Sequence, residues 1–271
     1  MKSQRLRYKL SMTFLRGPVT ALRHRDVRPD DTFIASYPRA GSTWLRFMLQ
    51  ELLTGSPSSF PSVNRVIPQI GFHQSAYRLP QGGRVIKTHE AFRPEYRRAI
   101  YLARDPRDVV LSEHAFQKAL GITTAGLDEY IDDFVTRRVN ANGCWRDHTR
   151  SWLDANENNS RIRIFRFEDL RRDTPGTLRQ ILNFLGVSPD QGRILDAIRN
   201  NSVAQMRSKE LATPQKTSRE GKFVREGKSG GWRKNLTEQQ ARRIEQAMQG
   251  EMERLAYYAT EDAFVSIGAY I

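Results

Sequence analysis

The sequence contains a single cysteine and no long hydrophobic run. Cys144 has no partner for an intramolecular disulfide, and no cysteine-based metal framework is present. No stretch approaches the roughly 20 consecutive apolar residues that span a bilayer. Polar residues interrupt the N-terminal segment before a secretory apolar run develops. We therefore expect a soluble, cytoplasmic protein, and a reducing compartment is compatible with it.

Lysine is scarce, although the chain is strongly basic. The 44 basic residues exceed the 30 acidic ones by 14, and only 9 of the 44 are lysine. The planar guanidinium fork suits phosphate and sulfate oxygens, which favours a polyanionic ligand. Genome base composition produces the same excess, so charge alone selects no function. Residues 1–30 form a basic N-terminal extension suited to peripheral membrane contact, with cations at Arg5, Arg7, Lys9, Arg16, Arg23 and Arg25.

Strand and helix signals alternate along the chain, and its length of 271 residues fits one domain, 1–271. Short runs of strand-forming residues lie at 32–37, 84–88, 99–103 and 161–167. Helical patterns follow the first, third and fourth of them, at 42–53, after Asp105 and over 174–186. This order predicts an α/β fold with a central parallel sheet flanked by helices, in a three-layer α/β/α architecture.

The remaining segments are less regular. Residues 56–83 are rich in Ser, Pro and Gly and predict a long irregular connection that forms part of an acceptor pocket. Residues 202–232 are polar and basic and predict a flexible segment. Thr237 and Gln240 form a capping box that opens a helix through about Tyr258.

The segment after the first predicted strand, YPRAGSTW at 37–44, is suited to an anion. A loop that opens a helix presents unpaired backbone N–H groups and the positive end of the helix dipole. Gly41 lets the backbone approach a ligand closely, and Arg39 adds charge. The triphosphatase pattern would need a glycine at Ser36 and a lysine at Ser42, so metal-dependent phosphoryl transfer is the weaker interpretation. A tight turn without a ligand remains the alternative.

Four motifs in order resemble the cytosolic-type, PAPS-dependent sulfotransferases, which have a P-loop-like fold. YPRAGSTW resembles their 5′-phosphosulfate loop. RVIKTHEAF, at 84–92, resembles the strand that ends in the catalytic base. YLARDPRDVVLSEHAF, at 101–116, and FVREGKSGGW, at 223–232, resemble the two segments that bind the 3′-phosphate.

The resemblance assigns roles to residues at the matching positions. His89 would be the general base, with Lys87 and Arg39 stabilising the transferring group, and His148 would lie on the acceptor side. A packed helical face with Trp145 and Trp152 is the equal alternative for His148. The co-substrate would be 3′-phosphoadenosine 5′-phosphosulfate, the product adenosine 3′,5′-bisphosphate, and no metal would be required. The nucleotide would be bound by Arg39, Ala40, Gly41, Ser42, Thr43, Trp44, Arg104, Ser112, Phe167, Arg225, Glu226 and Gly227.

The chain departs from the family pattern at four positions. Arg39 stands where many members have lysine, and arginine cannot donate a proton, so its role is limited to charge and orientation. Phe167 stands where many members have tyrosine. Glu226 replaces a basic residue that is common in the 3′-phosphate cluster, and Val203 replaces an aromatic residue that often touches the purine.

The sequence therefore predicts sulfuryl transfer to an acceptor hydroxyl of a carbohydrate, lipid or other small molecule, with no nucleic-acid partner. Two alternatives are a P-loop kinase-like phosphotransferase and a non-catalytic binder of polyanions or membrane surfaces. Neither the acceptor nor an oligomeric state can be read from the sequence.

Overall fold

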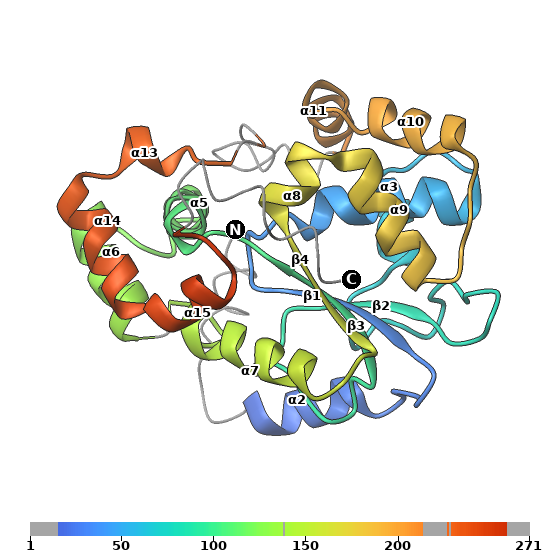
Figure 1. Ribbon diagram of the computed structural model, residues 1–271, viewed down its shortest axis with the longest axis horizontal. Helices are drawn as coiled ribbons and strands as arrows, with labels where there is room; N and C mark the ends of the chain where they lie inside the picture. The colour runs from blue at the N-terminus through green and yellow to red at the C-terminus, as the bar shows by residue number, and fades with distance from the viewer. Residues whose placement is uncertain (1–15, 138, 214–226, 228, 259–271) are drawn as a thin grey trace.

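The computed structural model describes residues 16–137, 139–213, 227 and 229–258. Its centre is a sheet of four parallel strands in the order β2-β1-β3-β4 (Figure 1). The strands are β1 (Thr32–Ser36), β2 (Val85–Thr88), β3 (Arg98–Ala103) and β4 (Ile162–Arg166). The predicted parallel sheet and its four strands are thus confirmed.

Alternate residues of the strands face opposite helical layers, because strand side chains alternate between the two faces of a sheet. Phe33 and Tyr101 pack in one core, and Ile34 and Ile100 pack in the other. The first core is covered by α5 (Pro106–Ala119), α6 (Leu127–Thr136), α7 (Trp145–Glu157), α14 (Glu238–Ala247) and α15 (Gln249–Arg254). The second is covered by α3 (Ser42–Thr54), α8 (Phe167–Arg172), α9 (Thr174–Phe184) and α10 (Gln191–Asn200) (Figure 1). The result is the expected three-layer arrangement.

Two segments expected to be irregular contain helices. In the 56–83 connection, α4 (Phe60–Val66) starts at a reciprocal cap, in which the Ser59 and Ser62 side chains each accept the other residue's N–H. In the 202–232 segment, α11 (Val203–Leu211) starts at an N-cap on Ser202. Only Met206 and Glu210 of α11 are buried, so the helix has little of the apolar periodicity that would have revealed it.

The C-terminal helix is interrupted, and a short helix, α13 (Trp232–Asn235), precedes it. The capping box of Thr237 and Gln240 forms as predicted and opens α14. The helical conformation then breaks at Met248, where φ is −126°, and resumes as α15. The single helix expected through Tyr258 was therefore wrong.

Part of the predicted N-terminal extension packs on the domain as α2 (Arg16–His24). The buried His24 ring donates from Nδ1 to the Thr20 carbonyl and accepts at Nε2 from the Tyr96 hydroxyl, at 2.5 Å. None of the helices in the described part of the chain combines the length and apolarity needed to cross a membrane. Membrane contact through the basic N-terminus stays a prediction, because residues 1–15 lie outside the described residues.

The carboxyl ends of the four strands bring the predicted site segments to one edge of the sheet. Tyr37 follows β1, His89 follows β2, Arg104 follows β3, and Phe167 follows β4. The chain runs from β1 to one neighbour and later returns to its other neighbour, β3, so the order reverses beside β1. Ligands of open α/β sheets bind in the crevice at such a reversal.

Candidate active site

A cavity of about 600 Å³ lies at this edge of the sheet. Two predicted site residues that the structure describes, Ala40 and His148, do not line it. The predicted residues that do are Arg39, Gly41, Ser42, Thr43, Trp44, Lys87, His89, Arg104, Ser112, Phe167 and Gly227. Arg225 and Glu226 lie outside the described residues. One cavity thus collects predicted site residues that are up to 188 positions apart in the sequence, since residues 39 and 227 both line it.

The loop between β1 and α3 holds its backbone in an unusual conformation. Arg39 and Gly41 have positive φ angles of 69° and 92°, which side-chain-bearing residues such as Arg39 rarely adopt. Gly41 is the N-cap of α3 and supplies no side chain to its first turn. A Cβ on Gly41 would lie 2.5 Å from Cδ2 of Phe167. The loop therefore presents backbone N–H groups at a helix N-terminus, against an aromatic ring that only glycine can approach so closely.

Arg39 of the loop forms a polar cluster with Arg104, which follows β3, and with Ser112 of α5. Arg104 donates to the carbonyl of Arg39 at 2.9 Å, and Arg39 Nε donates to the Ser112 hydroxyl at 3.1 Å. The Arg104 guanidinium also lies over the Phe167 ring, 4.6 Å from its centroid. Two guanidinium groups and a hydroxyl in one wall are suited to the oxygens of a phosphate or sulfate group.

His89 is held in one tautomer. Its Nδ1 lies 2.7 Å from the Ser36 carbonyl, which can only accept, so Nδ1 carries the hydrogen and Nε2 of the neutral ring keeps its lone pair. The Ser36 hydroxyl is a second neighbour of Nδ1, at 3.2 Å. Burial lowers the pKa of His89 well below its ordinary value of 6.5, and the charge of Lys87 lowers it further. The ring is therefore neutral at pH 7 and can accept a proton.

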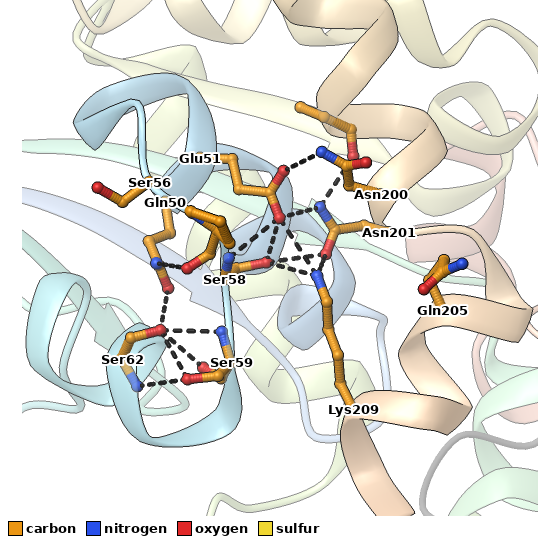
Figure 2. A network of polar contacts seen from close by, with 12 residues as sticks. Gln50, Glu51, Ser56, Ser58, Ser59, Ser62, Asn200, Asn201, Gln205 and Lys209 are labelled. Atoms are coloured by element: carbon orange, nitrogen blue, oxygen red, sulfur yellow. Dashed lines mark hydrogen bonds and ion pairs between the residues drawn. The ribbon is translucent and has the colours of Figure 1, made fainter. Parts of the chain in front are cut away.

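A polar network joins α3 to α10 and α11 (Figure 2), and Trp44 is hydrogen-bonded to one of its members. Its indole N–H donates to the Asn201 carbonyl at 2.8 Å. The buried Asn201 side chain donates to Glu51 at 3.0 Å and accepts from Lys209 at 2.8 Å, and Ser58 donates to both Glu51 and Asn201. Hydrogen bonds from its neighbours outweigh burial and lower the pKa of Glu51, so the carboxylate stays charged. The network fixes one aromatic wall of the cavity.

Asp108 holds the end of the late glycine-containing loop. Its carboxylate accepts from the backbone N–H of Gly230 at 2.7 Å and of Trp232 at 2.9 Å. Nearby, the Arg107 guanidinium stacks on Trp232, 3.8 Å from the ring centroid, and pairs with Asp105 at 2.7 Å. These contacts explain how Gly227 reaches the cavity.

His148 supports the site from behind. It is buried in the packed face of α7 with Trp145 and Trp152, which was the alternative interpretation of this helix. Its Nε2 lies 3.1 Å from the His89 carbonyl, and its Nδ1 lies 3.2 Å from the Tyr101 hydroxyl. The structure does not bring His148 to the cavity, and its contact with an acceptor stays a prediction.

The sequence matches the sulfotransferase domain family over residues 29–256, most of the chain. This protein belongs to the sulfotransferase family. Mouse sulfotransferase 2A2 is 28% identical over 250 residues, which cover 83% of this chain and 85% of that protein. Human sulfotransferase 2B1 is 28% identical over 249 residues, with coverage of 84% and 67%. The resemblance inferred from four motifs is confirmed, and sulfuryl transfer is favoured over the phosphotransferase and polyanion-binding alternatives.

Solved sulfotransferase structures share the fold. Retinol dehydratase in complex with androsterone and the inactive cofactor PAP superposes with a TM-score of 0.70 at 19% identity, covering 86% of this chain and 83% of that one. Mouse sulfotransferase SULT7A1 complexed with PAP gives a TM-score of 0.69 at 21% identity, with coverage of 89% and 93%.

Three contributors to this sulfotransferase site were missed from the sequence. Asp108 binds backbone N–H groups 122 and 124 positions away. Asn201 accepts from Trp44 and donates to Glu51, and each of these two hydrogen bonds joins residues at least 150 positions apart. No local sequence pattern predicts such contacts, because Glu51, Asp108 and Asn201 are each an ordinary polar residue within a helix or at its end.

The lowered pKa of His89 predicts that its imidazole gains a proton only at low pH. In the nucleotide-free sulfotransferase, we expect the NMR signal of the His89 ring to titrate with a midpoint well below pH 6.5, because burial and Lys87 disfavour the imidazolium. The spectrum of a His89→Asn variant assigns the signal. A midpoint at or above 6.5 would contradict the neutral-base assignment.

Proposed function

We propose that this sulfotransferase transfers a sulfuryl group from 3′-phosphoadenosine 5′-phosphosulfate to a hydroxyl of a carbohydrate, lipid or other small molecule, with His89 as the general base. The observation that carries the proposal is one cavity lined by both a histidine with a free Nε2 lone pair and the Arg39, Arg104 and Ser112 cluster. Two similar structures are described as complexes with PAP, the corresponding product nucleotide.

The residues present fit such a nucleotide. The uncapped first turn of α3 behind Gly41 offers N–H groups to the 5′-phosphate and the sulfuryl group, with the hydroxyls of Ser42 and Thr43. Arg104 and Ser112 are assigned to the 3′-phosphate. Trp44 and Phe167, which meet edge to face with centroids 6.2 Å apart, offer aromatic surface to the adenine.

Each protein group has one chemical task in this reaction. The donor supplies an activated sulfuryl group, whose bond to the phosphate oxygen breaks as the acceptor oxygen bonds to sulfur. His89 Nε2 takes the proton of the acceptor hydroxyl. Lys87 and Arg39, both at the cavity wall, offset the negative charge on the sulfuryl oxygens and on the leaving phosphate.

Calorimetry tests the donor assignment. We expect adenosine 3′,5′-bisphosphate to bind about 10-fold to 100-fold more tightly than adenosine 5′-monophosphate, because each charged hydrogen bond contributes about 1.5–3 kcal/mol. Replacing Arg104 with glutamine should remove most of this difference while leaving the monophosphate affinity nearly unchanged. Equal affinities of the unaltered protein for both nucleotides would contradict the assignment of Arg104 and Ser112.

A further inference from the structure

The part of the cavity wall that lies outside the nucleotide loop is rich in hydrogen-bonding groups. It is lined by residues of the connection between α3 and β2, by α5 and by the segment before α7. Apolar residues are present, including Phe60 and Ile122. The polar residues that line it are Asn64, Gln69, Glu113, Gln117, Asn140 and Asn142.

Glu113 is the most informative of these residues. It is 4% exposed, and its Oε1 accepts from Gln117 at 3.1 Å and from Asn140 at 3.2 Å. Its Oε2 is also buried and accepts no hydrogen bond from any described residue. A buried carboxylate oxygen without a donor is costly, and because Glu113 lines the cavity, a hydroxyl of a bound ligand can satisfy it.

The electrostatics of this carboxyl group favour a neutral donor. Burial raises the pKa of Glu113, and the positive charge of Arg39 lowers it. Since Arg39 already supplies a compensating charge, a hydroxyl group suits the free oxygen better than a second cation. The terminal torsion of glutamate is soft and nearly two-fold, so a small rotation can turn an oxygen toward the cavity.

Two amides on the same wall are also available to a ligand. The side chains of Gln69 and Asn142 make no hydrogen bond to another described residue, and both residues are partly exposed. Gln69 lies beside Lys87, to which it is paired by an isolated parallel bridge. An acceptor bound near His89 therefore meets both hydrogen-bond donors and acceptors around the reacting hydroxyl.

We propose that the acceptor is a polyhydroxylated molecule of carbohydrate type, in which a hydroxyl near the reacting one donates to Glu113 and others bind Gln69 and Asn142. This inference rests on the proposed function. A largely apolar acceptor with one hydroxyl would leave the Glu113 oxygen buried and unpaired, and sites built to hydrogen-bond a substrate discriminate strongly against analogues that lack the group. The apolar residues suit the C–H face of a sugar ring or an attached alkyl chain.

The test compares octyl glucoside and octyl galactoside with androsterone and 4-nitrophenol. We expect the protein loaded with adenosine 3′,5′-bisphosphate to bind at least one glycoside, and kcat/KM for that glycoside to exceed that for androsterone by about 10-fold or more. Glu113→Gln should lower kcat/KM for the glycoside by about 10-fold or more and should change kcat/KM for androsterone by less than about 3-fold. Glu129→Gln, the same substitution at an exposed residue of α6 that does not line the cavity, is the matched control and should leave the preference unchanged.

The outcomes separate this inference from the proposed function. Three results would each overturn the acceptor class. The first is a kcat/KM of the unaltered protein for androsterone that equals or exceeds the value for the glycoside, and the second is an equal loss of kcat/KM for both acceptors in Glu113→Gln. The third is the absence of glycoside binding to the nucleotide-loaded protein. Failure of adenosine 3′,5′-bisphosphate to bind at all would instead overturn the donor assignment.

Discussion

Replacing His89 with asparagine is expected to lower kcat by about 100-fold or more, the typical contribution of a positioned general base. Asparagine keeps a polar group near the Ser36 carbonyl but has no atom at the position of Nε2. The affinity for adenosine 3′,5′-bisphosphate should stay within about 3-fold of the original, because His89 is assigned to the acceptor proton and not to the nucleotide phosphates.

The matched control for this experiment is His114→Asn. The His114 ring donates from Nε2 to the Ala125 carbonyl at 2.9 Å, and the residue does not line the cavity. Turnover of the control should remain near that of the unaltered protein. A His89→Asn variant with turnover equal to that of the control would overturn the base assignment.

Replacing Gly41 with alanine is expected to weaken binding of adenosine 3′,5′-bisphosphate by about 10-fold or more. The left-handed backbone at this position costs alanine roughly 1–2 kcal/mol, so the free loop should relax away from the conformation that binds the phosphate. The added Cβ would also lie 2.5 Å from the Phe167 ring, which must shift away from the adenine site. Calorimetry measures the affinity, and a thermal melt shows whether the fold is retained.

Gly126 provides the control for this substitution. Its φ is −63°, and a Cβ added there would meet no heavy atom within 4 Å. Gly126→Ala should therefore bind the nucleotide like the unaltered protein. If Gly41→Ala bound it equally well, the close approach of this loop to the ligand would be refuted.

The sequence was sufficient to predict the sheet and the segments that meet at its carboxyl edge. Short runs of strand formers are local signals, and each one led correctly to β1, β2, β3 or β4. Because parallel strands place their carboxyl ends on one edge, the residues after them had to meet there. The order β2-β1-β3-β4 and the register were not predictable, since pairing depends on the competition between non-local contacts.

The supporting contacts were not accessible from the sequence for a physical reason. The bond between Trp44 and Asn201 and the bond between Asp108 and Gly230 depend on where two distant segments dock. The helix α11 was missed because its apolar residues are too few to show a period, and it is placed by polar contacts of Lys209. Such interactions become visible only after the hydrophobic layers have fixed the distances between elements.

The two sides of the cavity are built from different kinds of structure, and this has an evolutionary consequence. The proposed nucleotide side rests largely on strand ends and on the first turn of α3, so substitutions there disturb the packing of the whole domain. Much of the opposite side belongs to connections such as 56–83, and connecting segments tolerate sequence change better than the elements they connect. Descendants of this chain can therefore acquire new acceptors through changes in those connections, while inheriting an unaltered transfer chemistry.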